Sequence, residues 1–134
     1  MATILAHITV KPGTEAAFEA IAADLYAESH ANEDPIVRYE YWRGADERTY
    51  YTLLSFPDHR AFIGHQTSDQ HEAASPRLRE VMESIRLEWV DPIASSSPLT
   101  ATNAQSPADG ADDLTMLYTD RFAAEIADWW LALR

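Results

Sequence analysis

The alternation of apolar and polar positions predicts β-strands at several points in the chain. Residues 1–10 alternate strictly, which is typical of a strand with one buried face. The residues on that face are Ile4, Ala6, Ile8 and Val10. The segments 36–43 and 49–56 are β-branched and aromatic and flank a short turn, so they predict an antiparallel hairpin. Renewed alternation over 85–90 predicts a last strand.

Helical spacing predicts a first helix over residues 15–31, which are rich in Ala and Glu. Its expected N-cap is Thr14, after a Lys11-Pro12-Gly13 turn, and Glu33-Asp34-Pro35 should end it. Its apolar stripe consists of Phe18, Ile21, Ala22 and Leu25.

A second helical region begins after Pro57, with Asp58 as the expected N-cap. Ala61, Phe62 and His65 share the face expected to point toward the sheet. Thr67-Ser68 should break or re-cap the helix, and Pro76 is expected in the first turn of a later helical piece. The inward stripe of that piece consists of Leu78, Val81, Met82 and Ile85.

The resulting order is β-α-β-β-α-β within residues 1–92. This order predicts an α+β, ferredoxin-like domain, with a four-stranded antiparallel sheet and helices on one face. The other face carries apolar and aromatic side chains and is too apolar to remain in water. We therefore expect a homodimer in which a second copy covers that face.

The composition changes after this domain. Residues 93–113 are small and polar, and they predict a flexible linker. Residues 114–134 then predict an amphipathic helix, docked through Phe122, Ile126 and Trp129. Its continuous stripe consists of Leu114, Tyr118, Phe122, Ile126, Trp129 and Leu133.

The charge balance narrows the classes of partner. The 134 residues include 22 Asp and Glu against 10 Lys and Arg, a net charge of −12. Such a surface repels phosphates, which argues against nucleic acid and anionic membranes as partners. No apolar run approaches the roughly 18 residues of a membrane span, and the first residues do not resemble a signal peptide. We expect a cytoplasmic protein.

Residue types and spacings also argue against several cofactor sites. The chain has no cysteine, which excludes thiolate chemistry and cysteine-ligated metals. His59, His65 and His71 follow one another at intervals of six, so one helix cannot place them on a single face. The glycines build no phosphate-binding loop. We expect neither a metal nor a cofactor.

Several motifs together resemble the antibiotic biosynthesis monooxygenase superfamily over residues 3–92. They are Pro12-Gly13 after a strand, Arg38-Tyr39-Glu40, and Phe56-Pro57-Asp58 leading to Ala61-Phe62-Ile63-Gly64-His65. The resemblance implies a dimeric α+β barrel with a cavity between the sheet and the helices. In the family this cavity holds a flat aromatic molecule, a quinol, a small aldehyde or haem. Several members oxygenate aromatics without flavin, metal or haem.

The chain departs from the family pattern at positions that matter for chemistry. The family often has Trp where this chain has Phe56. The haem-degrading branch has Asn, Trp and a haem-ligating His where Ala6, His65 and Ser75 align here. A one-residue slip on the first strand would bring His7 into the first of these positions. These departures argue against haem degradation.

The candidate site consists of four residues. His65 is the candidate general base, because an imidazole in an apolar cavity can deprotonate a phenol or an enolisable ketone near neutral pH. Phe56 would stack on an aromatic ligand, and Thr52 or Tyr39 would orient it. The alternative for each residue is structural: a packing histidine or one exposed beside the helix break, and plain core packing for the others.

The candidate residues and the family resemblance lead to two possible functions. The first is a cofactor-independent monooxygenase, or a related isomerase, that acts on a small aromatic or quinone-like molecule. The second is a non-catalytic module that binds a small molecule or a protein and keeps the fold. An open cavity with His65 in its wall would favour the first, and a space filled by side chains would favour packing.

Overall fold

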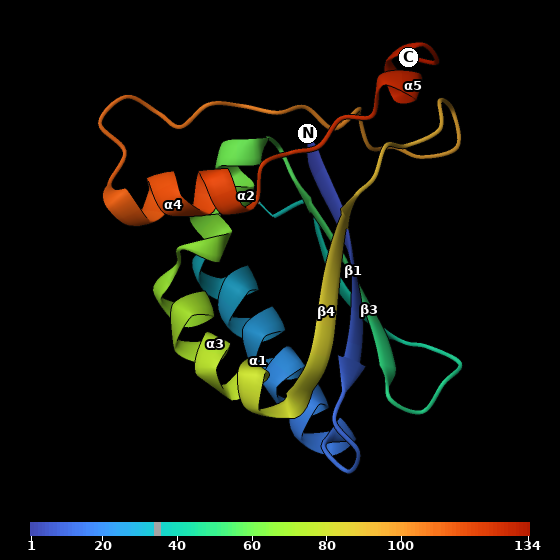
Figure 1. Cartoon of the computed structure of the whole chain (residues 1–134), viewed down its shortest axis with the longest axis vertical. Coiled ribbons are helices and arrows are strands. Elements are labelled where there is room, and N and C mark those ends of the chain that lie inside the picture. Colours follow the sequence, from blue (N-terminus) through green and yellow to red (C-terminus); the bar gives the residue numbers. More distant parts are fainter. Residues whose placement is uncertain (34–35) are drawn as a thin grey trace.

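The computed structural model describes residues 1–33 and 36–134. Within them the chain forms, in order, β1 (Ala2–Val10), α1 (Glu15–Asn32), β2 (Arg38–Arg43), β3 (Thr49–Phe56), α2 (His59–Gln66), α3 (Asp69–Val81), β4 (Met82–Trp89), α4 (Asp113–Arg121) and α5 (Asp128–Leu131). The strands form one antiparallel sheet in the order β2-β3-β1-β4. Helices α1 and α3 cover one face of it, and the other face is open (Figure 1). The predicted α+β, ferredoxin-like architecture is confirmed.

The core lies between the central strand β1 and the helices. Ile4, Ala6, Ile8 and Val10 are all buried, as the alternation predicts. They meet the predicted stripe of α1, in which Phe18 is 1% exposed. Each large side chain in this layer contributes about 1.5–3 kcal/mol by leaving water. Within the described residues, no helix combines the length and apolar character needed to cross a membrane.

The second helical region forms two helices because it contains two caps. The Asp58 carboxylate accepts a hydrogen bond from the Ala61 amide at 2.9 Å, which confirms the first cap. The Ser68 hydroxyl caps α3 by accepting from the His71 amide at 3.4 Å. The expected re-capping at Thr67-Ser68 is confirmed, but Pro76 lies in the interior of α3 and not in its first turn.

Two other helix boundaries differ from the expectations. Helix α3 ends at Val81, because the Val81 carbonyl accepts a hydrogen bond from the Lys11 amide at 2.8 Å. Met82 is already extended, so the last strand starts three residues before the predicted Ile85. Thr14 precedes α1, but its side chain does not cap that helix. The expected helix end at Glu33-Asp34-Pro35 lies partly outside the described residues.

The C-terminal region does not form the single expected helix over 114–134. Asp112 caps α4, but Phe122 leaves the helical conformation. The carbonyl oxygens of Phe122 and Ala123 bond instead to His59 Nε2, at 3.0 Å, and to the Trp89 indole N–H, at 2.9 Å. These tertiary hydrogen bonds replace the next helical turn. Phe122, one of the three expected docking residues, packs on Phe62.

The remaining anchors of the tail are weaker than expected. Ile126 is half-buried in a surface groove beside Trp89. Trp129, expected to dock, lies in α5 and is 66% exposed. The apolar stripe of the sequence is therefore distributed over two short helices and the turn between them.

The segment 93–113 contains no helix or strand before α4 begins at its last residue, but it is fastened to the sheet at one point. Thr102 is fully buried, and its hydroxyl donates to the Val90 carbonyl at 2.7 Å and accepts from the Thr3 amide at 3.1 Å. The His59 ring also contacts the Gln105 carbonyl at 3.1 Å. A segment expected to be flexible therefore has fixed points beside both β1 and α2. The division of the chain at residue 92 stays a prediction.

We predict that the open face of the sheet forms a homodimer interface. Leu5 pairs with Leu53, and Tyr51 pairs with Trp42, on the side of the sheet opposite the helices. Trp42 is 58% exposed in the single chain. A stable dimer through this face should bury roughly 2,000 Å² or more. Light scattering at micromolar concentration should give the mass of a dimer.

Leu53→Arg should shift the protein to a monomer, because it places a bulky charged side chain beside Leu5 on the face that the second copy would cover. Leu117→Arg is the matched control, since Leu117 lies on α4 and is 59% exposed. A wild-type protein that is monomeric at micromolar concentration would contradict the prediction.

Candidate functional site

His65 lies at the end of α2 and points into the core. It is 2% exposed, and its ring meets the edge of Tyr39 at 5.1 Å between centroids. On another side it contacts Phe56 at 5.2 Å. The Asp58 cap and the buried Phe62 fix the rotation of α2 that directs His65 toward the sheet. Three of the four expected site residues are thus in contact.

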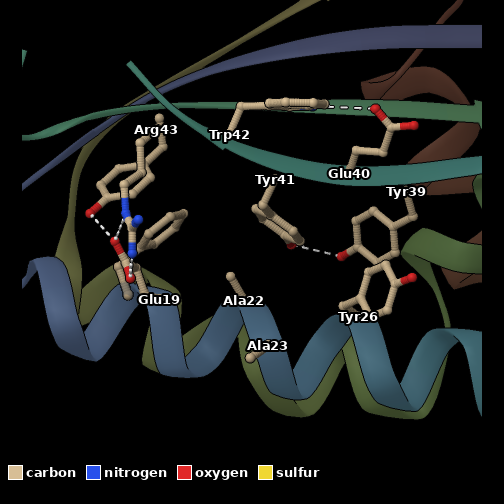
Figure 2. A pocket seen from close by; sticks show the side chains of 11 residues that line it. Glu19, Ala22, Ala23, Tyr26, Tyr39, Glu40, Tyr41, Trp42 and Arg43 are labelled. Atoms are coloured by element: carbon tan, nitrogen blue, oxygen red, sulfur yellow. Dashed lines mark hydrogen bonds and ion pairs between the residues drawn. The ribbon is translucent and has the colours of Figure 1, made fainter. Parts of the chain in front are cut away.

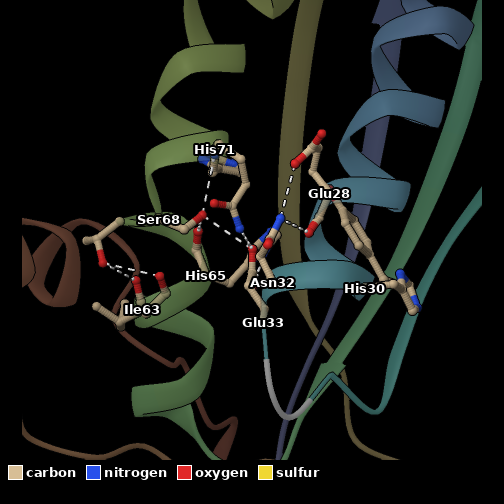
Figure 3. Close-up of polar contacts among 12 residues, drawn as sticks. Glu28, His30, Asn32, Glu33, Ile63, His65, Ser68 and His71 are labelled. Atoms are coloured by element: carbon tan, nitrogen blue, oxygen red, sulfur yellow. Dashed lines mark hydrogen bonds and ion pairs between the residues drawn. The ribbon is translucent and has the colours of Figure 1, made fainter.

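A carboxylate from another element holds the His65 ring. Glu33 follows the last turn of α1, and its Oε2 lies 2.7 Å from His65 Nδ1 (Figure 3). The same carboxylate accepts a hydrogen bond from Gln70 at 2.5 Å, and the Ser68 hydroxyl lies 3.3 Å from it. Burial favours the neutral acid, but the hydrogen bonds and the charge of His65 outweigh it and lower the pKa of Glu33. Glu33 is therefore an anion at neutral pH.

This contact determines which nitrogen of His65 is available for chemistry. An anionic carboxylate accepts a hydrogen bond, so Nδ1 carries the proton of the ring and donates a hydrogen bond to Glu33. The opposite nitrogen, Nε2, then has a free lone pair. Nε2 is buried and has no hydrogen-bond partner among the described residues. A buried, oriented imidazole with an unused acceptor is the arrangement required of a general base.

His65 lines a cavity of about 430 Å³ between the sheet and the helices. Thr52 on β3 lines the same cavity, and its buried hydroxyl has no partner in the described part of the chain. Tyr39 and Tyr41 on β2 form part of the wall, with their hydroxyl oxygens 2.8 Å apart. The open side is bordered by α3, β4 and α4 through Arg79, Leu87 and Arg121.

Phe56 occupies a different place from the one expected. It is 1% exposed, packs between His65 and Phe62, and is not among the described residues that line the cavity. The geometry therefore gives Phe56 the packing role, in which it supports the far side of the imidazole. His65, Tyr39 and Thr52 do share the cavity wall.

The two tyrosines remain protonated under ordinary conditions. Burial is the main cause that raises the pKa of Tyr39 above its usual value, and the neighbouring Tyr41 adds to the effect. Burial likewise raises the pKa of Tyr41 to about 12. The pair can therefore donate a hydrogen bond to a ligand oxygen, but neither is a base at neutral pH.

A larger hollow of about 690 Å³ lies between α1 and β2 (Figure 2). Its polar side chains already bond to one another. The Glu19 carboxylate accepts two hydrogen bonds from Arg43, each of 2.7 Å, and a third from Tyr50 at 3.0 Å. Arg43 is the main cause that lowers the pKa of Glu19 to about 2. A satisfied ion pair stabilises the surface and offers no free group for chemistry, so the cavity at His65 is the candidate site.

Comparison with known proteins now identifies the family. The model of the antibiotic biosynthesis monooxygenase family matches residues 1–77, more than half of the chain. The chain belongs to the antibiotic biosynthesis monooxygenase family. No curated protein matches the chain.

Solved structures agree with this assignment. A Caulobacter crescentus protein described as a candidate antibiotic biosynthesis monooxygenase is 26% identical, with a TM-score of 0.65, over 69% of this chain and 89% of its own. A Shewanella oneidensis protein is 26% identical, with a TM-score of 0.61, over 66% of this chain and 87% of its own. A Pseudomonas aeruginosa protein, at 22% identity and a TM-score of 0.64 over 69% and 94%, shares the fold.

The residues of the cavity can also be compared with the pattern of the haem-degrading branch. His65 and Ser75 line the cavity together with Ala6, so all three positions aligned with the haem-degrading branch lie in its wall. They present a methyl group, an imidazole already bound to Glu33, and a hydroxyl that accepts from Arg79 at 2.6 Å. This donor set does not match the haem-degrading pattern.

Two important residues do not stand out in the sequence. Glu33 is one of 22 acidic residues and carries no distinguishing signal. The argument that a spacing of six residues puts His65 and His71 on different faces holds only if one continuous helix contains both residues. The break at Ser68 moves His71 onto α3 and brings the two rings to 5.0 Å.

His71 should make the stability of the protein depend on pH. Burial, followed by the charge of His65, lowers the pKa of His71 to about 4. Between about pH 6.5 and 4 the unfolded chain therefore binds a proton that the folded protein does not. The free energy of unfolding should fall by up to about 3 kcal/mol across this interval as the pH decreases. The lowered pKa of Glu33 continues the trend at lower pH.

Denaturant unfolding between pH 7 and 4 measures this slope. His71→Leu should flatten it, because the imidazole that titrates only in the unfolded chain is gone. His30→Leu removes an exposed histidine and should keep the wild-type slope. A His71→Leu slope equal to that of the wild type would show that another group causes the pH dependence.

Proposed function

We propose that this protein is a cofactor-independent monooxygenase that oxidises a small phenolic or quinol-like aromatic molecule. One observation carries the proposal: His65, oriented by Glu33, lines a cavity between the sheet and the helices, and its buried Nε2 has no hydrogen-bond partner among the described residues. Membership of the antibiotic biosynthesis monooxygenase family supports the same reaction class. The cavity volume of about 430 Å³ suits a molecule of two or three fused rings.

The first step is removal of the phenol proton by His65 Nε2. Glu33 stabilises the imidazolium that forms, because its carboxylate accepts a hydrogen bond from Nδ1–H and carries the opposite charge. Thr52 and the Tyr39–Tyr41 pair are placed to donate hydrogen bonds to ligand oxygens.

The phenolate is electron-rich enough to reduce O₂ without a cofactor. One electron passes to O₂, and the resulting superoxide joins the ring carbon opposite the oxygen to form a peroxide. The peroxide takes the proton from His65, and its O–O bond breaks as the C–H proton leaves that carbon. One oxygen atom remains as a carbonyl and the other leaves as water, so a phenol and O₂ give a quinone and water.

The same base would serve a related isomerase. Removal of a proton next to a ketone and its return at another carbon need His65 but consume no O₂. An oxygen electrode, used together with product analysis, separates the two reactions. Binding without turnover of any phenol, quinol or enolisable ketone would favour the non-catalytic module.

Replacement of the base should abolish most of the activity. His65→Ala should lower kcat by about 10²–10⁴ on any phenol or anthrone that the wild type oxidises under air. Circular dichroism and thermal unfolding should show that the variant is folded. His30→Ala, which removes an exposed histidine, is the control and should keep full activity. Equal turnover by His65→Ala and the wild type would remove the catalytic role.

Glu33 should act as a positioning residue. Glu33→Gln keeps the shape but not the charge that stabilises the imidazolium, so kcat should fall by about 10²-fold with little change in KM. Glu33→Asp should recover part of the loss. A fall in stability with unchanged kcat would mean that Glu33 only ties the helices together.

A further inference from the structure

Most cationic side chains of this acidic chain bind a carboxylate or a backbone carbonyl group. Six of the ten Lys and Arg residues form ion pairs with carboxylates: Arg38, Arg43, Arg48, Arg77, Arg86 and Arg134. Lys11 and Arg60 instead donate to backbone carbonyls. Arg79 and Arg121 remain, and within residues 1–33 and 36–134 neither has a carboxylate at ion-pair distance.

Both of these arginines line the cavity that contains His65. Arg79 comes from α3, and its only hydrogen-bonded side-chain partner in the described residues is the Ser75 hydroxyl at 2.6 Å. Arg121 is the last residue of α4, and its guanidinium lies over the rings of Phe122 and Tyr118, at 5.3 and 6.0 Å from their centroids. The stacked guanidinium is held in place while its N–H groups stay available.

Both arginines influence the pKa of Tyr118, so both lie near that residue. The hydrogen bond from Tyr118 to Glu72 is the main cause that raises the pKa of Tyr118. The positive charges of Arg121 and Arg79 oppose that rise. Glu72 also lines the cavity, and its carboxylate already accepts a hydrogen bond from the Tyr118 hydroxyl. Two cationic side chains and the His65 imidazole therefore line the same cavity.

Arg79 and Arg121 are both exposed, so their N–H groups are open to a ligand that enters the cavity from solvent. A net charge of −12 repels anions from the protein as a whole, so an anionic ligand needs local positive charge to enter. The guanidinium fork fits a carboxylate, with two parallel N–H groups for its two oxygens. The unpartnered His65 Nε2 and Thr52 hydroxyl, on residues at most 3% exposed, supply the polar groups for the rest of the ligand.

We propose that the substrate is an aromatic acid, whose carboxylate is bound by Arg79 and Arg121 while its phenolic end reaches His65. This inference rests on the proposed function for the identity of the site and adds the chemical class of the ligand. It makes α4, which follows the part of the chain matched by the family model, a specificity element of this protein.

Two ligands of equal shape test the charge preference without any turnover. Anthraquinone-2-carboxylate and anthraquinone-2-carboxamide are titrated into the full chain by calorimetry. The carboxylate should bind about 10- to 100-fold more tightly, the gain expected of hydrogen bonds to a charged group. Added salt should weaken the binding of the carboxylate and leave the binding of the amide unchanged. Equal affinities, or failure of the carboxylate to bind at millimolar concentration, would overturn the proposal.

The arginine variants locate the effect. Arg121→Gln and Arg79→Gln should each remove most of the preference, and Arg121→Lys should retain part of it. Arg77→Gln is the matched control, because Arg77 lies on the same helix as Arg79 but pairs with Asp24 at 3.1 Å. A preference unchanged in both Arg121→Gln and Arg79→Gln would overturn the proposal.

His65→Gln separates this proposal from the proposed function. The preference for the carboxylate should persist in His65→Gln, because it depends on the arginines. Loss of turnover with the preference intact supports both proposals. A wild-type protein that prefers the carboxylate but oxidises no phenol would refute the monooxygenase alone, whereas oxidation of phenols with no charge preference would refute the aromatic-acid class alone.

Discussion

The contact between Glu33 and His65 connects the packing of the helices to the chemistry of the cavity. The imidazole lies in the core, where an unpaired polar ring would be costly, and the carboxylate satisfies one nitrogen. Gln70 and Ser68, at the start of α3, reach the same carboxylate. One side chain thus joins the end of α1 to the junction of α2 and α3. Loss of one partner from such a buried pair typically costs about 3–5 kcal/mol.

This arrangement couples stability to chemistry. Glu33 binds Nδ1 of the buried His65 ring, and the proposed reaction uses the opposite nitrogen, Nε2, which has no partner among the described residues. Phe56 and Tyr39 hold the ring from two other sides. A base fixed on three sides loses little entropy when a ligand arrives, which is the benefit of preorganisation.

The fold was predictable from the sequence because its signals are local. Alternation in β1 and helical spacing in α1 depend only on neighbouring residues, and both predict the correct core. The site was predictable in part, since Thr52, Tyr39 and His65 follow from the same facing rules. Glu33, His71 and Arg121 were not, because their roles come from contacts across 32 residues or more, or from a helix break that changes the spacing argument.

The tail shows a further limit of local reasoning. A continuous apolar stripe over 114–133 predicts one helix, and nothing in the stripe reveals that His59 and Trp89 compete for its carbonyl groups. Those two side chains come from α2 and β4, so the break belongs to the packed structure and not to the segment itself. Trp129 consequently faces water, although its size favours burial.

The hydrogen bond between Thr3 and Thr102 has a consequence for folding during synthesis. These residues are 99 positions apart, so bringing them together closes a long loop. During synthesis, β1 to β4 leave the ribosome well before the residues of α4 that complete the cavity wall. Until then Ile85 and Leu87, which border the open side, lack that cover. A nascent chain therefore exposes an incomplete cavity until residues 113–122 have been added.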